Sequence, residues 1–135
     1  TDGALRLGLS NVKSGVGDAT VYNADLGLFD AVLCDVPCSG FGVIGRKPEI
    51  KYKPVTDFAS LFDIQLKILN NADKYLRVGG RILYSTCTVR KAENGDVVKA
   101  FLDKHIGYEL KYDYTFMPHK DKTDGFYSAL LVKCR

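Results

Sequence analysis

The sequence predicts an α/β fold with a mostly parallel sheet and an antiparallel pair of strands at its C-terminal edge. Two observations lead to this prediction. Short apolar runs alternate along the chain with longer segments whose apolar residues recur at helical spacing. That alternation is typical of parallel strands joined by right-handed helical crossovers. The last two apolar runs follow one another without a helical segment between them, which favours an antiparallel pair at one edge.

Composition narrows the class of protein further. A length of 135 residues favours one domain. Hydrophobic residues make up 46% and charged residues 26%, as in an average globular domain, and the formal charge of +3 is too small for a polycationic nucleic-acid arm. No apolar run approaches the ~18 residues that span a bilayer, so no membrane partner is expected. Four cysteines are too few for a disulfide scaffold and favour a reducing compartment, the cytoplasm.

The first part of the chain is expected to contain the end of a helix, two strands and a loop. Residues 1–8 fit a helix that stops at a glycine, and residues 11–16 form a weak strand. Phe29 to Asp35 (FDAVLCD) is a nearly continuous apolar run, typical of a strand buried on both faces of a parallel sheet, and Pro37 ends it. The stretch 36–55 is rich in glycine and proline. We predict an ordered functional loop there, because about twenty residues without structure are unusual in a compact domain.

The rest of the chain continues the alternation. Asp57 is expected to cap a long helix whose apolar residues recur at helical spacing as far as Leu76. The elements that follow are expected in this order: a strand at 81–85, a helix at 93–105, a strand at 108–112, a polar loop at 118–125 and a strand at 126–134.

Residues with chemical potential follow two strands that we expect to be neighbours. Asp35 and Cys38 follow the first strand, and Cys87 follows the strand at 81–85. Neighbouring strands lie about 4.8 Å apart, so two thiols and one carboxylate would converge on one edge of the sheet. Open α/β sheets bind their ligands at that edge. Catalysis by a thiol requires positive charge or a helix N-terminus nearby, and Arg90 lies shortly after Cys87.

Other interpretations of the cysteines stay open at this point. A cysteine at the end of a strand is more often a small core residue than a nucleophile, and Cys34 and Cys134 are assigned to packing. No CxxC pair or histidine cluster supports a zinc site, so no metal is expected. A disulfide between Cys38 and Cys87 is geometrically possible, and we interpret it as an oxidation artefact.

Five segments carry a more specific signal. They are DVPCSG at 35–40, GRKPEIKY at 45–52, LRVGGRILYSTCT at 76–88, Glu93-Asn94 followed by Val97-Val98, and Pro118-His119 with the TDGFY of 123–127. Together they resemble, in order, the motifs of the Sun/Fmu family of RNA (cytosine-5) methyltransferases, close to the ribosomal small-subunit methyltransferase B type. The resemblance covers the chain from Asn11 to Lys133. It implies a Rossmann-like fold of the kind that uses S-adenosylmethionine.

The resemblance also implies residue roles. Cys87 is implied as the nucleophile that adds to carbon-6 of cytosine, and Cys38 as the residue that assists product release. Asp35 is implied to hold the cytosine edge near N3 and to lie beside the cofactor. Asp18 is implied to accept from the adenine amino group of S-adenosylmethionine, although a turn aspartate is the alternative. DNA cytosine methyltransferases instead use the cysteine at the position of Cys38. The STC context of Cys87 favours the RNA type.

A basic loop suggests the partner. Arg46, Lys47 and Lys51 are expected to contact RNA phosphates, whose charge dominates affinity, and a solvated basic loop is the alternative. The resemblance implies ribosomal RNA as the substrate, and transfer RNA stays open. The sequence does not predict an oligomeric state.

One family feature is missing from the sequence. Family members hold the methionine part of S-adenosylmethionine in a Gly-rich loop (DxCAAPGGK-like) and the ribose with an acid after the next strand, and neither occurs here. We therefore expect residues 1–135 to be the C-terminal portion of a methyltransferase catalytic domain, truncated at its N-terminus, with residues 1–28 perturbed by the loss of partner strands. Two functions stay open: an RNA-methylating enzyme, and a catalytically inactive truncated domain that binds RNA or another partner.

Overall fold

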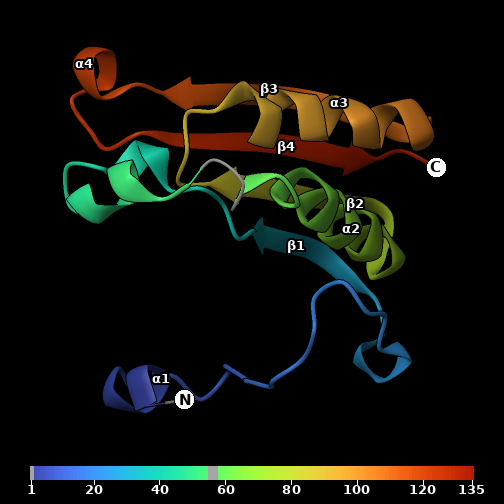
Figure 1. The fold of residues 1–135 in the computed structure, drawn as a ribbon. Helices are drawn as coiled ribbons and strands as arrows, with labels where there is room; N and C mark the ends of the chain where they lie inside the picture. The colour runs from blue at the N-terminus through green and yellow to red at the C-terminus, as the bar shows by residue number, and fades with distance from the viewer. Residues whose placement is uncertain (1, 55–57) are drawn as a thin grey trace.

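The computed structural model describes residues 2–54 and 58–135 (Figure 1). Its α-helices are α1 (Asp2–Arg6), α2 (Leu61–Lys74), α3 (Gly95–Lys104) and α4 (Pro118–Asp121). Its strands are β1 (Phe29–Asp35), β2 (Leu76–Thr86), β3 (Tyr108–Phe116) and β4 (Phe126–Lys133). Short 3-10 turns are η1 (Ala24–Leu26), η2 (Phe41–Val43), η3 (Pro48–Tyr52) and η5 (Lys91–Glu93).

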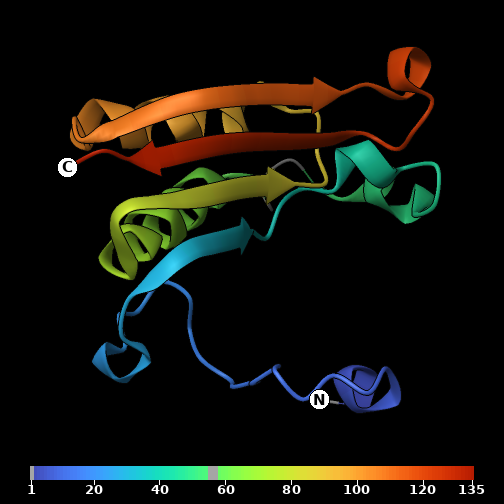
Figure 2. The ribbon, with the colours of Figure 1, turned by 180° about the vertical axis from the view of Figure 1, so that it is seen from behind.

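The four strands form one open mixed sheet in the order β1-β2-β4-β3. β1 and β2 run parallel, while β4 runs antiparallel to both β2 and β3. The predicted α/β fold and the antiparallel C-terminal edge pair are therefore confirmed, with parallel pairing confined to β1 and β2 within the described sheet. Helices α2 and α3 lie on one face of this sheet, and the opposite face is turned to the viewer, bare of helices, in Figure 2. No helix in the described part of the chain has the length and apolar character needed to cross a bilayer.

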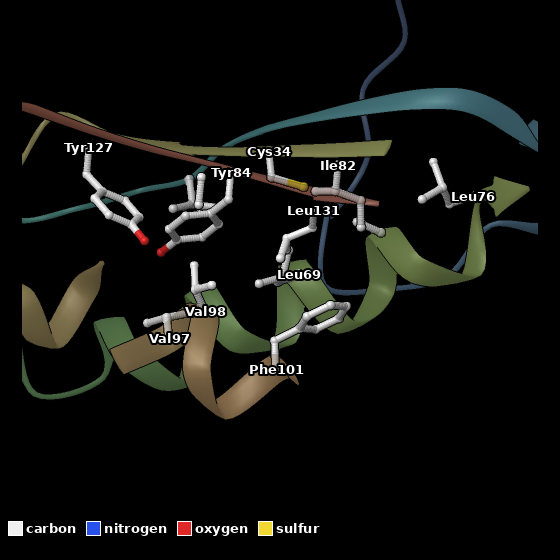
Figure 3. Packing of buried hydrophobic residues seen from close by; sticks show 13 residues of the cluster. Cys34, Leu69, Leu76, Ile82, Tyr84, Val97, Val98, Phe101, Tyr127 and Leu131 are labelled. Atoms are coloured by element: carbon white, nitrogen blue, oxygen red, sulfur yellow. The ribbon is translucent and has the colours of Figure 1, made fainter. Parts of the chain in front are cut away.

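The hydrophobic core fills the space between the covered face of the sheet and the two helices (Figure 3). Ile82 and Tyr84 of β2 and Leu131 of β4 point from the sheet and are fully buried. Leu69 of α2 and Phe101 of α3 meet them from the helices and are also fully buried. Each such side chain contributes about 1.5–3 kcal/mol to folding. The helical spacing of apolar residues in 61–74 and 95–104 thus has the structural role that the sequence predicted.

The structure corrects the interpretation of β1. The sequence predicted a strand buried on both faces, but Phe29 is 43% exposed, Leu33 is 66% exposed and, within β1, only Cys34 is buried. The physical reason is position: β1 is the edge of the described sheet, and α2 covers one of its faces only. The apolar run correctly indicates a strand, but in the described structure only the face of β1 that packs against α2 is covered.

Three further expectations have different outcomes. The weak strand predicted at 11–16 is wrong, because these residues are exposed coil and no strand lies beside them to pair with in the described sheet. The polar loop predicted at 118–125 contains the short helix α4, which the sequence reasoning missed. The cap predicted at Asp57 lies outside the described residues.

Residues 2–28 touch the sheet domain through few polar contacts. The Asn23 amide donates to Tyr75 Oη at 2.6 Å, and Asn71 Nδ2 donates to the Ala19 carbonyl at 2.9 Å. The apolar side chains of this segment are largely exposed, among them Leu5, Leu7, Leu9, Val12, Val16 and Val21. A segment with so little buried apolar area opens at low free-energy cost.

We predict that amides of residues 2–28 exchange with deuterium at least about a hundredfold faster than those of β2 and β4, because local opening exposes them. Hydrogen exchange with mass spectrometry measures both sets in one sample. Strong protection throughout residues 2–28 would contradict the prediction.

A polar network closes one end of the core, where α2, β3 and β4 meet. Asp73 Oδ1 forms an ion pair with Lys133 Nζ at 2.9 Å and accepts from Tyr108 Oη at 2.8 Å, and His105 Nδ1 lies 3.7 Å from Asp73 Oδ2. Burial alone would raise the pKa of Asp73, but the hydrogen bonds from Lys133 and Tyr108 and the Lys133 charge outweigh it and lower that pKa. The ionised carboxylate is therefore the form that stabilises the fold.

Asp73→Asn is expected to lower the free energy of unfolding by about 1–2 kcal/mol, a modest value because solvent screens this partly buried carboxylate. Because the folded pKa is lowered, the loss is full above about pH 4 and shrinks as pH falls further. Urea unfolding at several pH values measures it. Asp103→Asn, which alters only the exposed Lys99–Asp103 pair, is the control. Equal losses at pH 7 and pH 3 would refute the assignment.

Candidate active site

Two cysteine sulfurs meet at the carboxyl edge of the sheet. Asp35, the last residue of β1, stands opposite Ser85 of β2 in the parallel register. The loops that follow these two residues carry Cys38 and Cys87, and their Sγ atoms lie 3.0 Å apart. The Cys87 amide also donates to Cys38 Sγ at 3.3 Å. The expected convergence of two thiols on one edge is thus confirmed.

The surroundings of Cys38 favour its protonated form. Burial, the hydrogen bond to Cys87 and the negative charge of a Cys87 thiolate raise the pKa of Cys38. Cys38 therefore keeps its proton at neutral pH and can direct its S–H group at the neighbouring sulfur. With its proton retained, Cys38 can act as the hydrogen-bond donor of the sulfur pair.

The carboxylates predicted for the site lie near the same edge. Asp35 is exposed, and its Oδ1 accepts from Ser85 Oγ at 3.1 Å. Asp18 is also exposed and accepts from the Thr20 hydroxyl at 2.7 Å and from the Thr20 amide at 2.8 Å. These two hydrogen bonds lower the pKa of Asp18. The contacts with Thr20 are those of a turn aspartate, and the same carboxylate lines a cleft.

A cleft of about 760 Å³ runs between the segment 15–26, β1 and α2. Small-molecule sites commonly have volumes of about 300–1,000 Å³. Asp18 and Asp35 line it together with apolar groups that include Val32 and Tyr75. Asn71 lines it as well, and its buried Oδ1 has no hydrogen-bond partner among the described residues. The cleft therefore offers carboxylates and an apolar wall to a ligand.

The predicted basic residues lie on the 41–53 loop beside the thiols. Lys47 and Lys51 are exposed. Arg46 has a 77% exposed side chain, but its Nε lies 2.6 Å from Asp124 Oδ2, so an acid already balances part of its charge.

The other two cysteines behave differently from each other. Cys34 is buried, which confirms its packing role and raises its pKa to about 12. Cys134 is exposed, so its assignment to packing is wrong, because the chain leaves the sheet directly after β4. Within the described residues, no three side chains of the His, Cys, Asp and Glu types are grouped so that they could hold a metal ion.

Two glycines fix the loop that carries the basic residues against the Cys87 segment. The Gly42 amide donates to the Cys87 carbonyl at 3.0 Å, and the Gly125 amide donates to the Gly42 carbonyl at 2.8 Å. A Cβ atom on Gly42 would overlap the Gly125 carbonyl and lie 2.8 Å from the Cys87 carbonyl oxygen. Only glycine allows these backbones to approach so closely.

The sequence reasoning missed a polar layer beneath the thiols. Ser39 Oγ and Thr88 Oγ1 lie 2.9 Å apart, and the Ser39 amide donates to Glu93 Oε2 at 2.8 Å. The sequence indicated Glu93 and Asn94 only as part of a family motif. Their burial was not predicted, because a charged residue at the start of a helix is usually exposed to solvent. Their position directly after the Cys87 loop was the sequence feature that could have indicated a role near the thiols.

The open sheet, the thiol pair and the adjoining cleft define a Rossmann-like methyltransferase domain. A family model described as 16S rRNA methyltransferase RsmB/F matches residues 2–132. The chain belongs to this family.

Individual relatives agree with the family match. The chain is 37% identical to the probable ribosomal RNA small subunit methyltransferase B of Bacillus subtilis (strain 168), over 98% of this chain and 34% of that protein. The crystal structure of PH0851 superimposes with a TM-score of 0.91 at 32% identity and covers 98% of this chain and 33% of its own. NSun6 from Pyrococcus horikoshii, solved with SFG, gives 0.84 at 30% identity over 99% and 38%. The chain thus spans about a third of the length of curated relatives such as this one.

Gly42→Ala is expected to lower the free energy of unfolding by about 1–3 kcal/mol, because the added methyl group overlaps backbone that has little room to move. Thermal or urea unfolding measures the loss. Gly45→Ala is the matched control, since a Cβ there meets nothing within 4 Å. If the two variants were equally stable, the close approach of Gly42 and Gly125 would be ruled out as a constraint.

Proposed function

We propose that this chain carries the cytosine-reacting part of an S-adenosylmethionine-dependent RNA (cytosine-5) methyltransferase whose substrate is ribosomal RNA. The observation that carries the proposal is the pair of sulfurs 3.0 Å apart at the ends of two neighbouring parallel strands. A methyltransferase that acts on a more nucleophilic atom needs no thiol there, whereas carbon-5 of cytosine needs covalent activation. The rRNA methyltransferase names of the relatives support the choice of RNA.

The proposed reaction assigns a step to each thiol. The Cys87 thiolate forms a bond to carbon-6 of cytosine, and the electron pair of the 5,6 double bond moves into the ring, which makes carbon-5 nucleophilic. Asp35 holds the ring edge at N3, where a shared proton neutralises the adduct. After carbon-5 has gained a methyl group, its proton passes to a water molecule, the 5,6 double bond re-forms, the Cys87 thiolate leaves and the N3 proton returns to Asp35. Cys38 assists this last step.

The surroundings of the two sulfurs support this order of roles. The raised pKa of Cys38 favours a thiol there at neutral pH, which suits a hydrogen-bond donor or proton carrier better than a nucleophile. The reverse assignment, with Cys38 as the nucleophile as in DNA cytosine methyltransferases, would require ionisation of a thiol whose pKa is raised by burial. Both roles need reduced cysteines, and all four cysteines are free, in agreement with a cytoplasmic location.

The cleft beside Asp18 and Asp35 suits an adenosine-type cofactor. SFG, which is bound in the related NSun6 structure, is an analogue of S-adenosylmethionine. Asp18 offers an acceptor for an amino group, and Asp35 lies between the cleft and the thiol edge. S-adenosylmethionine supplies the methyl group when bound. The Gly-rich loop that holds its methionine end in the family is absent from this sequence.

The exposed Lys47 and Lys51 provide positive charge that RNA phosphates can contact. Lys47 and Lys51 lie on the loop that packs against the Cys87 segment, and Arg46 of the same loop forms an ion pair with Asp124. Phosphate contacts from such residues position a nucleic acid without reading its sequence. We assign ribosomal RNA as the partner, and transfer RNA is the competing substrate.

Cys87→Ala is expected to abolish a covalent complex with RNA that contains 5-fluorocytosine, because the carbon-6 bond cannot form. Cys38→Ala is expected to retain the complex and to slow its resolution on ordinary cytosine RNA, because release loses its assistant. Denaturing gel electrophoresis measures both complexes. The assay uses a polypeptide that contains this sequence together with the family's Gly-rich loop, with S-adenosylmethionine present.

Three outcomes separate the alternatives. Loss of the complex in Cys38→Ala, with retention in Cys87→Ala, would reverse the assigned roles. RNA binding without any covalent complex in the unaltered protein would favour the inactive RNA-binding domain. Preferential reaction with transfer RNA over ribosomal RNA would overturn the substrate assignment.

A further inference from the structure

We propose that Glu93 is a positioning residue that holds Cys38 against Cys87 through the backbone of Ser39. The inference rests on the proposed function only for the roles of the two thiols. Glu93 is 2% exposed and lies at the end of η5, directly behind the loop that carries Cys38. No contact links its carboxylate to either sulfur among the interactions of the described residues, so its influence passes through the loops.

One side of the Glu93 carboxylate holds the Cys38 loop. Oε2 accepts from the amide of Ser39, the residue after Cys38, at 2.8 Å. The same Oε2 accepts from Gln65 Nε2 at 3.2 Å, and that Nε2 also donates to the carbonyl of Pro37, the residue before Cys38, at 2.9 Å. The backbone is thus held on both sides of Cys38 by one carboxylate and one amide group.

The other side of Glu93 is tied to the segment that carries Cys87. Arg90 donates from one guanidinium nitrogen to Oε1 at 3.0 Å, and Tyr84 Oη donates to the Glu93 carbonyl at 2.7 Å. Cys87 lies midway between Tyr84 and Arg90 in the chain. Glu93 therefore links the two loops, and a change in its hydrogen bonds alters the separation of the sulfurs.

The Arg90 side chain is itself held in place. Its guanidinium carbon lies 5.8 Å from the centre of the Phe41 ring and 5.4 Å from that of Phe58. These rings cover the cation and leave it directed at Glu93, with a third of its side chain exposed. A partly buried ion pair of this kind adds little stability relative to apolar side chains of similar size. The role of the pair is instead to orient the Glu93 carboxylate, which accepts the hydrogen bond from the Ser39 amide in the Cys38 loop.

The test compares Glu93→Gln with the control Asp103→Asn, which removes the exposed carboxylate of the Lys99–Asp103 pair on α3 and leaves the site untouched. Purified reduced protein is equilibrated with oxidised and reduced glutathione, and the Cys38–Cys87 disulfide is quantified by peptide mapping. Each protein disulfide forms from two thiols as one oxidised glutathione becomes two reduced molecules. The equilibrium constant for this exchange reports how closely the two sulfurs are held.

Glu93→Gln is expected to lower that equilibrium constant by about tenfold, while Asp103→Asn leaves it unchanged. The pH midpoint for alkylation of Cys38 by iodoacetamide is expected to fall by about one unit in Glu93→Gln, because Cys38 loses its close contact with Cys87. If Glu93→Gln lowers the free energy of unfolding but moves neither readout, Glu93 is only structural and the proposal is wrong.

A measurement on the unaltered protein covers the case in which Glu93→Gln does not fold. The Ser39 amide should exchange with deuterium as slowly as the amides of the β2 ladder, as monitored by NMR, because the Glu93 carboxylate holds it. Rapid exchange of this amide would overturn the proposal. These assays contain neither RNA nor cofactor, so their failure is distinguishable from failure of the proposed methyltransferase function.

Discussion

The parallel pairing of β1 with β2 is the constraint on which the site depends. Parallel strands end at the same edge of a sheet, so the register that places Asp35 opposite Ser85 also brings the two following loops together. A slip of one residue would shift one loop by about 3.3 Å, separate the sulfurs and turn the side chains of one strand to the opposite face of the sheet. The core prevents such a slip, because Ile82 and Tyr84 are buried against the helices on alternate positions of β2.

Hydrophobic packing determines the positions of the strands, but hydrogen bonds between polar groups determine the distance between the two loops. Thr86 donates to Asn94 Oδ1 at 2.6 Å, and Asn94 in turn donates to the Thr88 carbonyl at 3.0 Å. Together with Ser39 and Glu93, these groups form a buried polar layer under the thiols. A hydrogen-bonded network of this kind fixes one geometry, because any shift leaves a buried polar group without a partner. The apolar core supplies stability, and the polar layer supplies alignment.

The sequence predicted the features that depend on local pattern. Helical spacing identified α2 and α3, and the ends of β1 and β2 correctly brought Cys38 and Cys87 to one edge. Features that depend on contacts between residues far apart in the sequence were harder to predict. The exposure of β1 depends on which strand and which helix lie beside it, and a strand at 11–16 needs a neighbour that the described sheet does not provide. Burial of Glu93 likewise depends on contacts with Ser39 and Gln65, which no periodicity in the sequence indicates.

The identity of the sulfur that bonds to carbon-6 is the most direct test of the division of roles between the thiols. The measurement is tandem mass spectrometry of protease- and nuclease-treated complexes between RNA that contains 5-fluorocytosine and a polypeptide that contains this unaltered sequence together with the family's Gly-rich loop. A nucleotide attached to the peptide that contains Cys87 is the predicted result. Attachment to the peptide that contains Cys38 would contradict the assignment of the nucleophile and, with it, the meaning given to the raised pKa of Cys38.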